Sequence, residues 1–189
     1  MIARNLLVIL LWIGFWTTSV SGQLKTTETE DVDIIYTSPL HKYLLPQLIS
    51  TFTNSYNFHR NLFGYTPTEN ISILMQDFGD FGHGGADALP TNNVNIGIGP
   101  FNYVYETMPA SERMNWLMHH ELTHIVTTDM PNKRDRFWRS IFRGKVSTSI
   151  DDPLSIMYSY LTNPRRYAPR WYHEGSAVFM ESWMANTKG

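Results

Sequence analysis

The sequence predicts an α+β domain in which a small mixed sheet comes before most of the helices. Strand-like runs at Val32–Tyr36 and Ile71–Met75, and an alternating stretch at Asn93–Pro100, occupy the first half of the chain. The second half reads as consecutive helices rather than as alternating strands and helices. This order favours α+β over a doubly wound sheet, and a chain of 189 residues has room for one such domain.

The first 22 residues have the pattern of a signal peptide. Arg4 supplies the positive charge, Leu6–Trp16 is the apolar run, and small or polar residues lead to Gln23. Because the run is shorter than the about 20 residues of a membrane-spanning helix, we expect cleavage before Gln23 and no stable membrane span afterwards. An uncleaved anchor is the alternative. The expected protein is exported, periplasmic or secreted, with residues 23–189 as its domain.

Composition narrows the classes of partner and of site. The net charge of -2 gives no electrostatic reason to expect a nucleic-acid partner. The chain has no cysteine, which excludes disulfides, a thiol nucleophile and cysteine metal ligands. Any metal must therefore be held by nitrogen and oxygen atoms. An exported protein of this size without disulfides is typical of the bacterial envelope or of secretion.

The remaining elements of the first half are predicted from local patterns. The polar segment Gln23–Asp31 is expected to be a loose lead-in. Apolar residues at helical spacing predict one helix over 40–63, ended near Gly64. The glycine-rich segment 78–90 is predicted to be a loop or turn. A metal ligand at His83 within it is the less favoured alternative, because no partner lies at ligand spacing.

Four helical segments are predicted in the second half: from Pro109 to about Asp129, Lys133–Lys145, Pro153–Leu161, and from Pro169 to about Trp183. The second of these is basic and amphipathic, which favours a solvated helical face over a site for an anionic partner. Its apolar residues are expected to face the protein while its arginines face solvent. The two sets are Phe137, Trp138, Ile141 and Phe142 inward, and Arg134, Arg136, Arg139 and Arg143 outward.

The stretch W-L-M-H-H-E-L-T-H contains H-E-x-x-H at His120, Glu121 and His124. Residues four apart share one face of a helix, so both imidazoles can reach one metal ion. Glu121 is turned by about 100° and can reach a metal-bound water as a general base. His119 has threonine at the matching offset and is expected to pack on the other side of the helix. The alternatives are a chance match and a hydrogen-bonded histidine pair, but an unpaired carboxylate among apolar residues is costly.

A catalytic zinc site needs a third protein ligand, and the segment P-R-W-Y-H-E-G-S-A-V-F-M-E-S-W offers one. Glu174 and Glu181 are seven residues apart and share one helix face. Glu174 is the predicted ligand, with His173 as a competing ligand, and Glu181 is the predicted acceptor for an imidazole N–H. The small residues Gly175–Ala177 are expected to let this helix pack closely on the histidine helix.

H-E-L-T-H followed by W-Y-H-E-G-S-A-V-F-M-E resembles the gluzincin zinc metallopeptidases, the clan of thermolysin and aminopeptidase N, and within it the peptidase MA-like group. The resemblance covers roughly Ile71 to Trp183. It implies a zincin-like fold, with an edge strand beside an active-site helix, and a Zn²⁺ cofactor. The aminopeptidases carry a similar N-E-G-F-A segment whose glutamate binds zinc, which implies Glu174 here. The group also has a glycine-containing strand before the active-site helix, which N-V-N-I-G-I-G-P resembles.

The expected function is that of an exported zinc metallopeptidase, which hydrolyses a peptide or protein substrate with a water activated by Glu121. An extended substrate is expected to lie along Asn93–Pro100 as an added strand. Two alternatives are a zinc-retaining scaffold module that does not cleave and a membrane-surface module that uses Arg134–Lys145. The candidate donors for the developing oxyanion are Tyr158, Tyr167 and Tyr172.

The sequence differs in two respects from the enzymes that it resembles. With 49 residues between His124 and Glu174, the chain has a longer spacing than the aminopeptidases, so an insertion carries the basic segment. The sequence stops fifteen residues after Glu174, where such enzymes usually continue into further helices. We therefore expect the domain to be C-terminally incomplete, the N-terminal part of a longer exported protein with a β-propeller.

Overall fold

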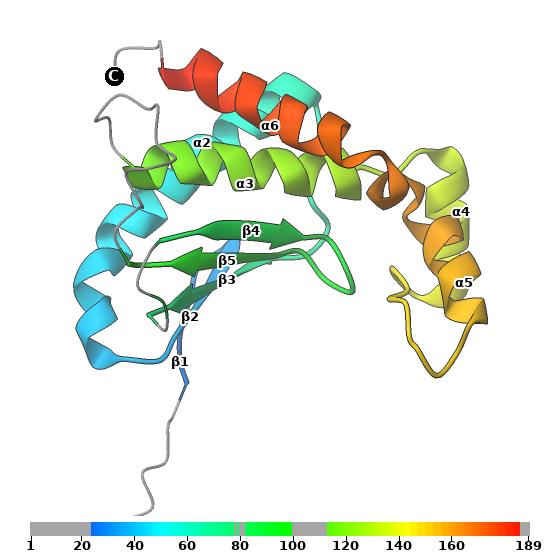
Figure 1. The fold of residues 1–189 in the computed structure, drawn as a ribbon, viewed down its shortest axis with the longest axis horizontal. Helices are drawn as coiled ribbons and strands as arrows, with labels where there is room; N and C mark the ends of the chain where they lie inside the picture. The colour runs from blue at the N-terminus through cyan, green and yellow to red at the C-terminus, as the bar shows by residue number, and fades with distance from the viewer. Residues whose placement is uncertain (1–23, 78, 80–81, 100–112, 186–189) are drawn as a thin grey trace, which may run out of the picture.

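Five β-strands form one mixed sheet, and helices cover one of its faces (Figure 1). The computed structural model describes residues 24–77, 79, 82–99 and 113–185. The strands are β1 (Lys25–Glu28), β2 (Val32–Tyr36), β3 (Ile71–Gln76), β4 (Gly84–Asp87) and β5 (Asn93–Gly97). They lie in the order β1-β2-β3-β5-β4, in which β2, β3 and β5 are parallel and the two edge strands antiparallel. A mixed sheet with several helices confirms the predicted α+β class.

The core lies between the sheet and two helices, α2 (Leu45–Phe63) and α3 (Arg113–Asp129). Strands β2 and β3 alternate buried and partly buried residues, so that Ile34 and Ile73 lie side by side on the covered face. Helix α2 contributes Leu48 and Phe52, one turn apart and fully buried. Burial of each such side chain stabilises the fold by roughly 1.5–3 kcal/mol, and this packing sets the position of α3.

Helix α2 is shorter than the predicted helix over 40–63. The segment Pro39–Leu44 forms a separate 3-10 helix, η1, at whose start the Ser38 side chain accepts a hydrogen bond from the Leu40 N–H. Pro46 then occupies the first turn of α2, where a missing backbone N–H leaves no bond unmade. The helix ends at Gly64, as predicted, with φ at 58° in the left-handed region that glycine permits.

Helix α6 (Arg170–Ala185) lies across α3 on the side away from the sheet (Figure 1). Ala177 is fully buried in α6, as the predicted close packing requires. Gly175 is not part of this contact, because a Cβ placed there would meet no atom within 4 Å. The expectation that the whole small-residue segment Gly175–Ala177 faces the histidine helix is therefore wrong for Gly175, which lies on the outer side.

Between α3 and α6 the chain forms α4 (Lys133–Phe142), α5 (Leu154–Thr162) and the 3-10 helix η2 (Pro164–Tyr167), which lie at one end of the molecule (Figure 1). Their packing corrects the predicted orientation of the basic helix. Because α4 packs mainly on α5, only a narrow strip faces inward, where Trp138 stacks on Phe142. Phe137 and Ile141 are 58% and 53% exposed, and Arg139 turns inward.

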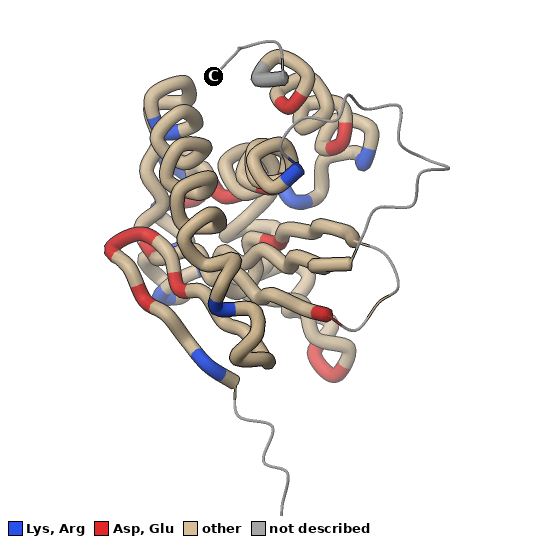
Figure 2. Tube along the Cα trace, turned by 90° about the vertical axis from the view of Figure 1, so that its left-hand side faces the viewer, with Lys and Arg blue, Asp and Glu red and all other residues tan. Residues whose placement is uncertain are grey.

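Three predictions about the sheet are also corrected. The glycine-rich segment 78–90, predicted to be a loop, contains the edge strand β4. The predicted exposed strand Asn93–Pro100, whose last residue lies outside the described ranges, forms β5 over Asn93–Gly97 and lies inside the sheet, between β3 and β4. The predicted loose lead-in pairs with β2 as β1, and acidic residues gather at the turn between these two strands (Figure 2). Strand pairing, rather than local propensity, decides the state of β4.

Two predictions lie outside the described residues, namely the signal peptide over 1–22 and the start of the histidine helix at Pro109. Within the described ranges, no helix combines the length and the apolar character needed to cross a membrane.

Candidate metal centre

Helix α3 presents the two motif histidines on the side away from the sheet. Met118, Leu122 and Ile125 are buried against the core, and this fixes the rotation of the helix. His120 and His124 then project together, with their Nε2 atoms 3.1 Å apart. Both side chains are mostly buried, because α6 covers this side of α3.

Glu174 in the first turns of α6 completes a three-residue group. Its Oε2 lies 3.6 Å from Nε2 of His120 and 3.7 Å from Nε2 of His124. With metal–ligand bonds of 2.0–2.1 Å, the ligand atoms of a tetrahedral zinc site lie about 3.3 Å apart. The structure therefore brings together the three predicted ligands at distances that fit one divalent ion, with two nitrogen donors and one oxygen donor.

Glu181 lies behind His120, where sequence reasoning put an acceptor. Its buried Oε2 is 2.6 Å from Nδ1 of His120. A carboxylate only accepts, so Nδ1 carries the proton and donates, which leaves the Nε2 lone pair directed toward Glu174 and His124. This contact fixes both the tautomer and the orientation of the ring.

The electrostatics of the two histidines differ. Burial, and the positive charge that His120 carries when it is protonated, lower the pKa of His124 to about 4, so the His124 ring is neutral at pH 7, as metal binding requires. Burial alone would lower the pKa of His120 too. The hydrogen bond from Glu181 and the negative charges of Glu121, Glu181 and Glu174 outweigh that burial and raise the pKa of His120.

Glu121 is 3% exposed, and its Oε2 has no hydrogen-bond partner. Burial raises the pKa of this carboxyl to about 7, against the opposing charge of His120 and with the repulsion of Glu174 and Glu181. Strand β4 comes close to it at Gly84, where a Cβ would stand 2.2 Å from Oε1 of Glu121. The Glu121 side chain is thus held between α3 and the edge of the sheet. Its Oε2 atom makes no hydrogen bond and can accept a proton.

An open cleft of about 440 Å³ lies over this centre. One wall is the edge strand β4 with the residue after it, the floor is α3, and the other wall is formed by η2 and the start of α6. The ion pair between Asp87 and Arg166 joins the two walls. The lining residues are Gly84, Gly85, Ala86, Asp87, Ala88, His120, Glu121, His124, Thr128, Arg166, Ala168, Arg170, His173 and Glu174.

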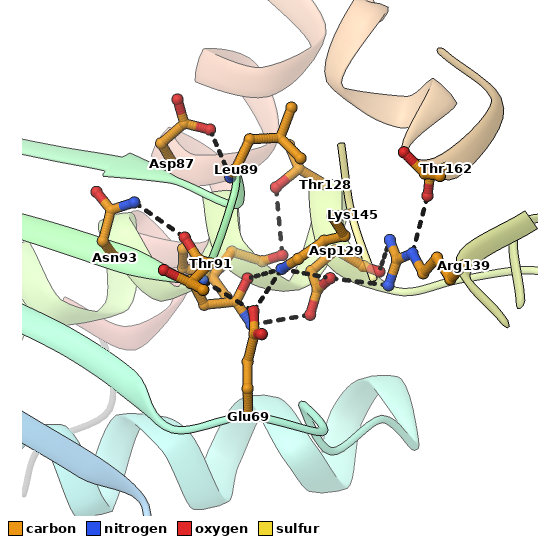
Figure 3. Close-up of polar contacts among 12 residues, drawn as sticks. Glu69, Asp87, Leu89, Thr91, Asn93, Thr128, Asp129, Arg139, Lys145 and Thr162 are labelled. Atoms are coloured by element: carbon orange, nitrogen blue, oxygen red, sulfur yellow. Dashed lines mark hydrogen bonds and ion pairs between the residues drawn. The ribbon is translucent and has the colours of Figure 1, made fainter. Parts of the chain in front are cut away.

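The far end of α3 is held by a buried charge cluster, which we call the Asp129 cluster (Figure 3). The Oδ2 atom of Asp129 accepts hydrogen bonds from the Tyr65 hydroxyl at 2.6 Å and from Asn92 Nδ2 at 2.9 Å. Its Oδ1 lies 3.0 Å from Arg139 and 3.1 Å from Lys145. Lys145 also contacts Glu69 at 2.6 Å, so both carboxylates share the charge of one buried ammonium group.

The cluster lowers the pKa of the Asp129 carboxyl despite its burial, because Lys145, the two hydrogen bonds and Arg139 favour the charged form. Its members come from the α2–β3 loop, the β4–β5 loop, α3, α4 and the segment after α4. It therefore connects α4 and the segment after it to the helix that carries the two motif histidines.

The other predicted site residues lie apart from the centre. Of the tyrosines named as candidate oxyanion donors, Tyr158 packs on Phe142 and Tyr167 on Tyr160, and Tyr172 is half exposed. None of the three is among the residues that line the cleft.

Three further histidines, His119, His83 and His173, lie in different surroundings. His119 is buried on the other side of α3, as predicted, with Nδ1 3.3 Å from Nε2 of His59. His83 is exposed and belongs to no metal-binding group of the described residues. His173, the competing ligand, also stays outside that group, but it lines the cleft.

Sequence reasoning missed Gly84, Asp87 and Arg166 as parts of the cleft. The segment around Gly84 has no strand pattern, and the ion pair joins residues 79 positions apart, which no local signal reveals. Comparisons with protein-family models, with curated proteins and with solved structures found no match.

Proposed function

We propose that this protein is an exported zinc metallopeptidase that hydrolyses peptide bonds. The observation that carries the proposal is the convergence of His120, His124 and Glu174 beside a buried carboxylate, Glu121, with an unused oxygen. A ligand group of this kind with an adjacent general base is the arrangement that metal-assisted hydrolysis requires. Export is supported by the signal-peptide pattern of residues 1–22.

When bound, zinc supplies a Lewis acid that polarises the scissile carbonyl and makes a nearby water more acidic. Glu121 accepts a proton from that water as the water oxygen adds to the carbonyl carbon. The carbon–nitrogen bond then breaks, and Glu121 returns the proton to the departing amine nitrogen. Glu181 keeps the His120 ring in the tautomer and orientation that binding needs.

The substrate is an extended peptide or protein segment. Strand β4 ends the sheet on the side of the cleft, so its outer edge offers backbone groups to an added strand. This replaces the earlier expectation that the substrate lies along Asn93–Pro100, because β5 is paired on both sides. Small residues at Gly84, Gly85 and Ala86 let a second chain approach closely.

The first test measures metal content and peptide hydrolysis in three purified variants and the wild type. We expect about one zinc per wild-type chain, and zinc affinity lowered by about 100-fold or more in Glu174→Ala, since a removed ligand costs at least as much as a removed supporting contact. Glu121→Gln is expected to keep its zinc and to lose about 100- to 10,000-fold in kcat. Glu30→Ala, which alters an exposed carboxylate in the β1–β2 turn, is the matched control and should resemble the wild type.

Two results would count against the proposal. Unchanged zinc affinity in Glu174→Ala would show that Glu174 is not the third zinc ligand. Stoichiometric zinc without cleavage of a diverse peptide library would instead favour a scaffold module that retains zinc and does not cleave.

A further inference from the structure

Among the described residues that line the cleft, two have side chains with buried polar atoms that lack a hydrogen-bond partner. One is Glu121, whose Oε2 is free to accept. The other is His173, whose Nδ1 and Nε2 are both shielded from solvent and make no hydrogen bond. In its neutral form an imidazole has one N–H donor and one acceptor, whichever tautomer is present. An unmade hydrogen bond in a buried group costs free energy, so such a group points to a partner that arrives with a ligand.

His173 is tied to the proposed metal centre by its place in the chain. It precedes Glu174 on α6, so the helix that positions a ligand also positions this ring. Its ring lines the same cleft as His120, His124 and Glu174. It is nevertheless outside the three-residue ligand group, whose atoms lie within 4.8 Å of one another. The ring is therefore beside the centre without being one of its ligands.

Other donors that line the cleft are already engaged. Arg166 pairs with Asp87, and Thr128 donates to the carbonyl oxygen of His124. Arg170 is almost fully exposed and lies 3.6 Å from Glu174. Among the described side chains that line the cleft, His173 alone combines a buried donor with the lack of a partner.

We propose that His173 is a catalytic residue whose ring N–H donates to the carbonyl oxygen of the scissile peptide bond, and this rests on the proposed function. As the water oxygen adds to the carbonyl carbon, the C=O electron pair moves onto oxygen, and the His173 N–H stabilises that negative charge. When the C=O bond re-forms, the carbon–nitrogen bond breaks and the nitrogen receives its proton from Glu121. Glu121 on α3 thus transfers the proton from water to the amine nitrogen, while His173 on α6 stabilises the charge on the carbonyl oxygen.

The test compares zinc-loaded wild type, His173→Ala and His173→Gln, in which the glutamine restores an N–H donor. We expect full zinc content in all three, a loss of about 100-fold in kcat with a small change in KM for His173→Ala, and partial recovery in His173→Gln. Tyr167→Phe and Tyr172→Phe are matched controls that remove donors outside the cleft, and both should stay within about threefold of wild type. A kcat within threefold of wild type in His173→Ala overturns the proposal.

A second measurement uses binding instead of turnover. A peptide phosphonate, whose tetrahedral P–O⁻ imitates the oxyanion, should bind about 100-fold more weakly to His173→Ala than to wild type. An uncleaved peptide should bind the Glu121→Gln protein and the Glu121→Gln/His173→Ala protein alike. Equal phosphonate affinity overturns the role of His173 while leaving hydrolysis by wild type intact. Loss of zinc from His173→Ala overturns it as well, by making His173 a ligand.

Absence of hydrolysis in wild type is a separate result, because it rejects the proposed function itself. A phosphonate affinity that still depends on His173 would then identify a ligand-binding donor and reject the catalytic assignment.

Discussion

Gly84 brings the backbone of β4 against the carboxylate of Glu121. A Cβ at this position would stand 2.2 Å from Oε1 of Glu121 and 2.5 Å from Cδ1 of Leu117. Both distances are far below ordinary van der Waals contact, so any side chain here must displace the proposed base or the strand. The absence of a side chain at one residue therefore sets how closely the sheet edge approaches the centre.

Gly84→Ala is accordingly expected to lower the free energy of unfolding by about 1–3 kcal/mol, as other overpacked sites do. The neighbouring Gly85→Ala is the matched control, since a Cβ there meets no atom within 4 Å and it should not lower the free energy of unfolding. Urea unfolding of both variants, followed by circular dichroism, measures the difference. Equal stability of the two variants would contradict the close approach of β4 to Glu121.

The H-E-x-x-H pattern let the sequence predict that His120 and His124 share one face of a helix as ligands and that Glu121 is turned away from them as a base. Residue spacing on one helix determines which side chains share a face. Glu174 was predicted in the same way, with help from the resemblance, and the structure places it beside both imidazoles. His173 was weighed only as a ligand. Its two unpartnered ring nitrogens depend on what surrounds them in space, and no spacing in the sequence carries that information.

At the scale of elements, the Asp129 cluster fastens α3 at its C-terminal end to segments from most of the chain. Lys145 and Asp129 are both almost fully buried, and Lys145, which also pairs with Glu69, is the main compensation for the charge of Asp129. Removing one partner from a buried pair leaves a charge without compensation, which costs more than the pair itself contributes.

Asp129→Asn is therefore expected to lower the free energy of unfolding by about 3–5 kcal/mol. Asp151→Asn, at an exposed carboxylate between α4 and α5, should change it by less than about 0.5 kcal/mol. Chemical denaturation of the zinc-free proteins would measure both values. A loss in Asp129→Asn no larger than that of the control would mean that the cluster adds nothing to stability.

Secondary structure was predicted correctly where apolar periodicity is strong. Prediction failed where contacts with distant segments determine the conformation or orientation of an element. The helices α5 and α6, the strands β2 and β3, and the C-terminal ends of α2 and α3 were predicted to within about two residues. Strand β4 has the sequence G-G-A-D, which favours a turn, and only its pairing with β5 makes it extended. The predicted orientation of α4 was wrong, because Arg139 donates to three acceptor atoms on Asp129 and Thr162 that the helical pattern alone does not reveal.

At the scale of the whole molecule, a buried pair of histidines joins α2 to α3. His59 and His119 are almost fully buried among aromatic rings, and burial lowers the pKa of each from 6.5 to about 4. The positive charge on His119 lowers the pKa of His59 further. Both rings are therefore neutral in the folded protein at pH values where the unfolded chain begins to bind protons.

This linkage predicts an acid-sensitive fold. Between about pH 6.5 and pH 4 the unfolded chain binds more protons at these two histidines than the folded protein does, so the free energy of unfolding falls as the pH falls through that window. The contribution is on the order of 3 kcal/mol for each histidine. Above pH 6.5 the pair contributes no pH dependence.

Urea unfolding at pH 7 and pH 5 of the wild type and of the double variant His59→Leu/His119→Leu isolates this effect, because other titrating groups are common to both proteins. The wild type should lose more stability between the two pH values than the variant does. An equal loss in both would assign the acid sensitivity to other groups.

Among the described strands, one side of β4 has no neighbour, and this side borders the cleft. A free strand edge is a template on which any extended chain can form backbone hydrogen bonds, including the same strand of a second copy. The four residues of β4 are few, and the charged Asp87 stands at the end. Both features limit self-association, so the shortness of the strand along which we propose that a peptide binds also protects concentrated protein from aggregation.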